Sequence, residues 1–155
     1  MTTDRPLRRA VAGMAVTAAL GGVAVAAVPR HASYAGDTSQ GQPVAIQISK
    51  KGKRLDYQIE WTANCDDGEQ LAARTATKPG DRIKPDRKGR FHFKSTAKGT
   101  LPGYGKVRGR NRIRGRVNRK RAKGAFTQDV HFKRHHKRIN CTTGEVTFRI
   151  PRTDK

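Results

Sequence analysis

LDYQIEWTANC, residues 55–65, alternates apolar with polar side chains along its whole length. Successive side chains of a β-strand point to opposite faces of a sheet, so a period of two predicts a strand. The inward set of this strand would be Leu55, Tyr57, Ile59, Trp61, Ala63 and Cys65. It is the clearest strand signal in the chain, and the rest of the fold can be worked out on either side of it.

Weaker alternation and turn residues predict further strands before and after this one. We expect them at 44–48, 71–77, around Ile83, at Phe91 and Phe93, and at 107–117, 125–132 and 146–150. Gly99 to Gly105 contains Pro102 and predicts an irregular loop. Seven to nine short strands with no helical period after residue 33 predict an all-β fold, a single antiparallel sandwich or barrel. The alternation alone favours neither architecture.

Residues 1–33 have the composition of an export signal that forms a helix. Arg5, Arg8 and Arg9 make a short basic head, and an uncharged apolar run follows from Ala10 to Val28. Cleavage would leave a domain of residues 34–155, whereas retention would leave the run as a membrane anchor. Either outcome predicts an extracytoplasmic protein, secreted or held in the cell envelope.

Cys65 and Cys141 are the only cysteines, and both lie in the pattern N-C-x-x-G-E. An even cysteine count in a small exported domain predicts a disulfide. The bond would close a loop of 75 intervening residues, worth about 4 kcal/mol in the chain-entropy model. A redox-active pair is the alternative, but the close C-x-x-C spacing that lowers a thiol pKa is missing.

The positive charge is concentrated in one part of the chain. The sequence holds 34 Lys and Arg against 12 Asp and Glu, and residues 82–138 alone hold 21 basic and two acidic side chains. Within this segment six basic residues occupy successive even positions, which on a strand share one face. They are Lys106, Arg108, Arg110, Arg112, Arg114 and Arg116, and Arg119, Lys120 and Arg121 extend the run through the next turn.

These nine residues are the candidate polyanion-binding residues. Same-face side chains lie about 6.6 Å apart on a strand, close to the spacing of about 6.8 Å between phosphates along one DNA strand. Arginine also suits bidentate contact with phosphate, sulfate or carboxylate. The expected partner is an anionic polymer or surface: an envelope phosphate polymer, an acidic polysaccharide, lipid headgroups or extracellular DNA. The alternative is a structural or interaction domain of the envelope whose basic face is only solvated.

Catalytic and metal-binding motifs are weak in this sequence. His131, His135 and His136 lie near Asp129, but basic neighbours would repel a cation, and a polar turn explains them equally well. No P-loop, GxSxG or HExxH pattern occurs. We therefore expect a protein that is not an enzyme, with no metal, no cofactor and no small-molecule substrate.

The opening Tyr34-Ala35-Gly36-Asp37-Thr38-Ser39-Gln40-Gly41 is followed by paired strands, a cysteine at a turn and a second cysteine before the last strand. This layout, over residues 34–150, resembles that of small exported β-domain proteins of actinobacteria. The resemblance implies a compact exported β domain, and it carries over no catalytic or binding residue.

Overall fold

The computed structural model describes residues 28–154. The expected signal helix and its cleavage sites therefore lie outside the described residues, apart from positions 28–33. Nine strands, all paired antiparallel, make up the fold: β1 (Ala32–Asp37), β2 (Pro43–Ile48), β3 (Leu55–Cys65), β4 (Gln70–Ala76), β5 (Arg90–Leu101), β6 (Gly105–Val117), β7 (Arg121–Arg134), β8 (Lys137–Thr142) and β9 (Val146–Pro151). No helix within residues 28–154 is long and apolar enough to cross a membrane.

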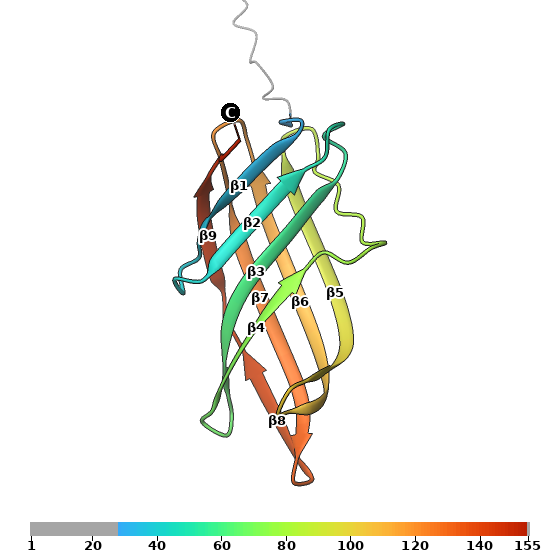
Figure 1. Ribbon diagram of the computed structural model, residues 1–155, viewed down its shortest axis with the longest axis vertical. Helices are drawn as coiled ribbons and strands as arrows, with labels where there is room; N and C mark the ends of the chain where they lie inside the picture. Colours follow the sequence, from blue (N-terminus) through green and yellow to red (C-terminus); the bar gives the residue numbers. More distant parts are fainter. Residues whose placement is uncertain (1–27, 155) are drawn as a thin grey trace, which may run out of the picture.

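The strands form one sheet that folds over into two facing layers. Its main path runs β1-β2-β3-β8-β7-β6-β5, with β4 beside β3 and β9 beside β7. Figure 1 shows β1 to β4 in front of β5, β6 and β7, with β9 along one side. Strand β8 joins the layers by pairing with both β3 and β7, and bridges such as Tyr34 to Arg152 join β1 to β9.

The prediction of an all-β, antiparallel fold is confirmed. Of the two predicted architectures, the closed barrel is wrong. Strand β4 pairs only with β3 and β5 pairs only with β6, so within the described residues the sheet stays open between β4 and β5. The prediction of an irregular loop from Gly99 to Gly105 is also wrong, because the β5–β6 ladder continues to the pair Leu101 and Gly105. Backbone pairing with a long neighbouring strand outweighs the weak strand preference of glycine there.

The core lies between the two layers and is built from the inward side chains of the alternating strands. Leu55, Ile59 and Ala63 of β3 have no measurable exposure, as the alternation in residues 55–65 predicts. From the opposite layer Ile113 and Phe126 are equally buried. Burial of this apolar set is the main favourable term in folding, at about 25 cal/mol per Å² removed from water.

Polar side chains also connect the layers. Trp61 Nε1 donates to Thr75 Oγ1 at 2.8 Å, and Thr75 Oγ1 donates to Gln128 Oε1 at 3.1 Å, so the chain of bonds runs from β3 through β4 to β7. Asn111, beside Gln128 in the β6–β7 register, is 7% exposed, and its Oδ1 has no hydrogen-bond partner. The inner face of the sheet is therefore polar at its middle.

The predicted disulfide between Cys65 and Cys141 is present, and the two residues are partners in the β3–β8 register. The two N-C-x-x-G-E segments lie side by side as a result, the first in the β3–β4 hairpin and the second between β8 and β9, which both pair with β7. Asp66 accepts hydrogen bonds from the side chain and the backbone N–H of Asn140, and these bonds hold the pKa of Asp66 below its ordinary value. The covalent bond and these hydrogen bonds tie the layers together at β8.

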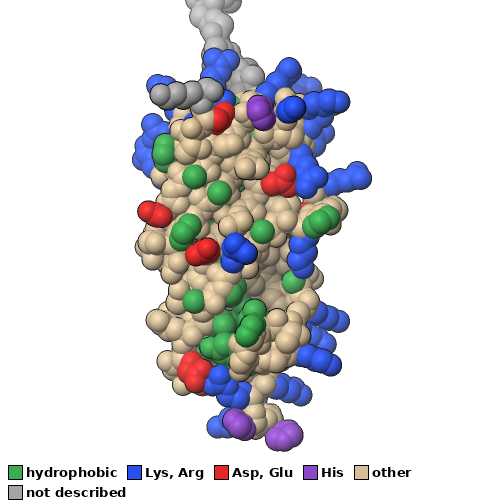
Figure 2. All heavy atoms as spheres, in the orientation of Figure 1, with side chains coloured by type: hydrophobic (Ala, Val, Ile, Leu, Met, Phe, Trp, Pro, Cys, Tyr) green, Lys and Arg blue, Asp and Glu red, His purple; other side chains and the backbone are tan. Residues whose placement is uncertain are grey.

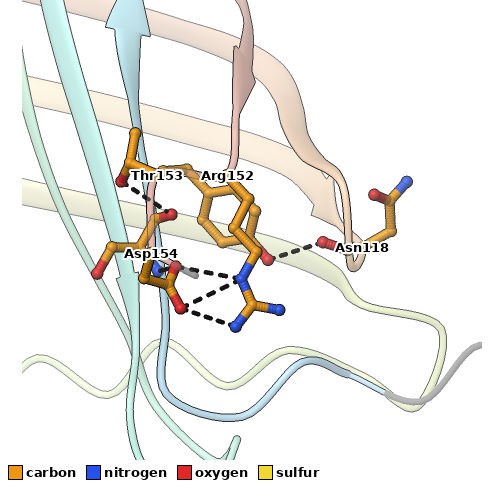
Figure 3. Close-up of polar contacts among 6 residues, drawn as sticks. Asn118, Arg152, Thr153 and Asp154 are labelled. Carbon is orange, nitrogen blue, oxygen red and sulfur yellow. Dashed lines mark hydrogen bonds and ion pairs between the residues drawn. The ribbon is translucent and has the colours of Figure 1, made fainter.

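The chain's last described residues fasten β1 and β9 at the other end. Arg152 and Asp154 face each other, with Nη2 and Oδ2 2.7 Å apart (Figure 3). Thr153 donates its backbone N–H to Ser33 O at 2.8 Å, and Tyr34 donates its hydroxyl to Asn118 O, also at 2.8 Å. Burial raises the pKa of Tyr34 to about 12, so its hydroxyl remains a donor at neutral pH.

Candidate anion-binding face

The outward face of β6 carries the six basic residues that the sequence singles out. Residues 106, 108, 110, 112, 114 and 116 are all exposed, while Asn111 and Ile113 between them are buried. Exposed and buried side chains alternate because β6 is an extended strand, paired with β5 on one edge and with β7 on the other. The sequence therefore places these side chains on one surface, as expected.

Neighbouring strands add more basic side chains to this surface. Antiparallel partners point to the same face, so the register identifies which residues join the row. Figure 2 looks onto the β1–β4 layer, where few blue side chains appear, and shows Lys and Arg projecting along the edge beside β5. We call the outward set the basic face: Arg90, Lys94, Lys98, Lys106, Arg108, Arg110, Arg112, Arg114, Arg116, Lys123, Lys133 and Arg149.

Few carboxylates neutralise the basic face. Arg114 pairs with Glu145 at 2.9 Å, and Arg112 lies 3.9 Å from Asp129. Arg90 pairs with Asp86 at 2.7 Å, and hydrogen bonds from the Arg90 backbone and side chain hold the pKa of Asp86 below its ordinary value. Such exposed pairs are worth about 0 to 1 kcal/mol each. Among the described residues, the other nine members of the face form no ion pair.

Four of the cations form a row across four strands. Arg90 is the partner of Arg116, Arg116 of Lys123, and Lys123 of Arg149. Directly opposite side chains have Cβ atoms about 5 Å apart, and like charges at such positions destabilise a sheet. At that separation two unit charges in water repel by about 0.8 kcal/mol, which splaying of the side chains reduces. An anion bound over the row would relieve the repulsion.

A hollow of about 890 Å³ opens beside this row. The next positions along β7 and β9 are occupied by Ala125 and Thr147, which are partners and have short side chains. Ser39, from the turn after β1, borders the same space: its N–H donates to Thr147 O at 2.8 Å, and its Oγ accepts from Thr147 N at 3.0 Å. We call this space the Thr147 hollow. The basic residues that line it are Arg90, Arg114, Arg116, Lys123 and Arg149.

The predicted extension through residues 119 to 121 lies at the same end of the face. Arg119 and Lys120 are exposed in the β6–β7 turn, whereas Arg121 begins β7 and is half-buried. The turn is shaped by Asn118, whose Oδ1 accepts the backbone N–H groups of Lys120 and Arg121. These residues line a smaller hollow of about 450 Å³, shared with Lys123 and Arg149.

A third hollow, of about 860 Å³, marks the opposite end of β6. Its basic lining residues include Lys98, Lys106, Arg108, Lys133 and Arg138. Beneath it Tyr104 packs edge-on against Phe132, with ring centroids 5.1 Å apart. The basic row of β6 therefore runs between two hollows that are both lined by cations.

The histidines do not gather. His135 and His136 occupy the exposed β7–β8 turn with positive φ values of 48° and 65°, and His131 Nδ1 lies 2.8 Å from Asn140 Oδ1 on β8. Within residues 28–154 no group of three or more His, Cys, Asp or Glu side chains is placed to hold a metal ion.

Arg90, Lys123 and Arg149 were not among the candidate residues from the sequence. They come from β5, β7 and β9, and only the register brings them beside Arg116. One signal was available: Arg90, His92 and Lys94 alternate with Phe91 and Phe93, which predicts a second outward row of basic residues.

The chain was also compared with known proteins. No family model matches the sequence, no curated protein shows significant similarity to it, and no solved structure matches the fold. The properties of the chain's own residues therefore carry the functional argument.

Proposed function

We propose that the protein is a secreted, non-catalytic β domain that binds an anionic polymer or surface through the basic face. The observation that carries the proposal is the register: twelve outward cations on four neighbouring strands, nine of them without an ion pair among the described residues. Such a surface attracts polyanions and releases their counterions on binding.

Export is supported by the basic and apolar composition of residues 1–28. The disulfide between Cys65 and Cys141 is consistent with an extracytoplasmic location, because such bonds persist in oxidising compartments. Outside a cell the available polyanions include envelope phosphate polymers, acidic polysaccharides, anionic lipid headgroups and DNA. A face that served only solubility would not need like charges directly opposite one another on four strands.

The test is binding to long-chain polyphosphate over a series of salt concentrations. The variant changes Arg108, Arg110, Arg112, Arg114 and Arg116 to Ser. The matched control removes five exposed cations outside the basic face, by changing Lys50, Lys51, Lys53, Arg74 and Lys78 to Ser. Both variants lower the net charge by five.

We expect the slope of log affinity against log salt to fall by about three to four units in the five-arginine variant and by less than one in the control. Equal slopes in the two variants would mean that total charge, and not the basic face, determines binding. The face would then be a solvated surface of a structural domain.

A further inference from the structure

We infer that the Thr147 hollow is a subsite that binds one phosphate group of the polymer, an inference that rests on the proposed function. Arg116, Lys123 and Arg149 would supply the positive charge, and the hydroxyl of Thr147 would supply a neutral hydrogen-bonding group. The inference distinguishes this end of the basic face from the rest of it, which would contact the polymer only through general electrostatic attraction.

The charges at the hollow are available to a ligand. Arg116, Lys123 and Arg149 form no ion pair among the described residues, although Arg116 Nε donates to Lys88 O at 3.0 Å. Two neighbouring cations are engaged instead, Arg90 with Asp86 and Arg114 with Glu145. The three unpaired cations therefore border the hollow from β6, β7 and β9, and the acidic residue Asp37, at the end of β1, lines it as well.

Space is available at the same place. Ala125 and Thr147 are the outward residues next to Lys123 and Arg149, and their short side chains leave the sheet surface uncovered between long basic ones. Elsewhere on β6 the outward positions are long basic side chains without interruption from 106 to 116. The hollow thus combines room for a ligand group with cations on its rim.

The donor arrangement suits a tetrahedral oxyanion. Its donors come from three neighbouring strands of the sheet, β6, β7 and β9, so several of them border the same space. A phosphate has oxygens directed toward several donors at once, and a terminal phosphate carries a charge of about −1.5 to −2 at neutral pH. A planar carboxylate offers two oxygens, both of which a single arginine can contact. A phosphate therefore uses more of this site than a carboxylate would.

The probe is tripolyphosphate, titrated calorimetrically into the full-length oxidised protein at constant ionic strength near 0.15 M. The hollow variant is Lys123→Gln with Arg149→Gln. Its matched control, Lys94→Gln with Arg110→Gln, removes one Lys and one Arg from the same face outside the hollow. Lys94 and Arg110 lie four or more residues from Arg116 along the ladder, which is farther than the Debye length of about 8 Å. Their charges are therefore largely screened from Arg116.

We expect the hollow variant to bind tripolyphosphate at least tenfold more weakly and the control less than threefold more weakly. A third variant, Thr147→Val, keeps every charge and removes the hydroxyl, and we expect it to lose affinity about threefold to tenfold. Unfolding midpoints of all the variants would verify that each one folds.

Four results would overturn the inference. Equal losses in the two double variants would show that the hollow contributes charge alone. Tighter binding of a sulfated oligosaccharide of equal charge, with the same dependence on Lys123 and Arg149, would assign the hollow to sulfate esters. Binding of long polyphosphate without measurable binding of tripolyphosphate would exclude the subsite and leave the proposed function standing. Failure of both ligands would exclude the subsite and would also exclude polyphosphate as the anionic polymer.

Discussion

Lys123 and Arg149 are partners in the register of β7 and β9, and both side chains leave the sheet on the face that carries Arg116. Twenty-five positions separate the two residues in the chain, so their juxtaposition is a property of the fold. Opposed cations on adjacent strands cost stability. A sheet that retains four of them in line, Arg90 and Arg116 included, has a surface that an anion would stabilise.

Gly115 and Gly124 are partners beneath the Thr147 hollow, and both are required for packing. A Cβ on Gly115 would collide with the backbone carbonyl oxygen of Lys123 and lie 2.8 Å from Phe91 Cζ. A Cβ on Gly124 would collide with the carbonyl oxygen of Arg114 and lie 2.6 Å from Phe148 Cζ. We expect Gly115→Ala to lower the free energy of unfolding by about 1 to 3 kcal/mol, measured by urea unfolding. Gly99→Ala is the control, because nothing lies within 4 Å of its Cβ position. Equal stability of the two variants would contradict this packing.

Removing the disulfide tests how much the covalent link contributes. Replacing Cys65 and Cys141 together by Ser should lower the free energy of unfolding by about 4 kcal/mol, because the unfolded chain regains the freedom of the closed loop. Urea unfolding of the oxidised protein and the double variant measures the difference. A loss below about 1 kcal/mol would mean that the Asp66 and Asn140 hydrogen bonds hold β8 against the β3–β4 hairpin without the link.

The Arg152 and Asp154 pair predicts a pH dependence of stability. Hydrogen bonds from the Arg152 side chain, and then from Ser33 N–H, hold the pKa of Asp154 below its ordinary value. A lowered pKa in the folded state means that the unfolded state binds more protons, so the stabilisation is complete above the unfolded pKa of about 3.9 and is lost as the pH falls through the folded value.

We therefore expect the protein to be more stable than an Asp154→Asn variant at pH 7, with the difference shrinking steadily below about pH 4. Thermal unfolding from pH 7 to pH 2 measures this difference. Asp56→Asn is a surface control, since the Arg54 and Asp56 pair joins no separate strands. A difference between the protein and the Asp154 variant that did not change with pH would show that the carboxylate charge is not what fastens the chain end.

Alternation of apolar residues predicted most of the fold because most strands bury one face only. Strand β3 has the predicted bounds, and its inward residues are buried except Cys65, which is half-buried. Two strands were missed for physical reasons. In β1 the sequence ASYAGD has only Tyr34 as a large apolar residue, and in β8 the sequence KRINCT has Ile139 alone beside charged and polar residues. Both segments are strands because their backbones pair with β2, β3 and β7, although their own sequences show no clear alternation.

The basic row of β6 was predictable for the same reason, since it lies within one strand. The Thr147 hollow was not predictable, because it depends on the register of β7 against β6, on the register of β9 against β7, and on the turn after β1 that brings Ser39 to Thr147. A shift of one residue would turn Lys123 and Arg149 inward. The alternation within each strand shows which side chains point outward, but it does not show which residues of neighbouring strands are partners.

Lysine acetylation in the presence and absence of long-chain polyphosphate would show on the unaltered protein whether the polymer covers the basic face. Mass spectrometry would give the rate of modification at each lysine. We expect the polymer to protect Lys94, Lys98, Lys106 and Lys123 on the basic face and to leave Lys50, Lys51, Lys53 and Lys78 reactive. Protection spread evenly over both groups, or confined to the second, would contradict the assignment of the basic face as the binding surface.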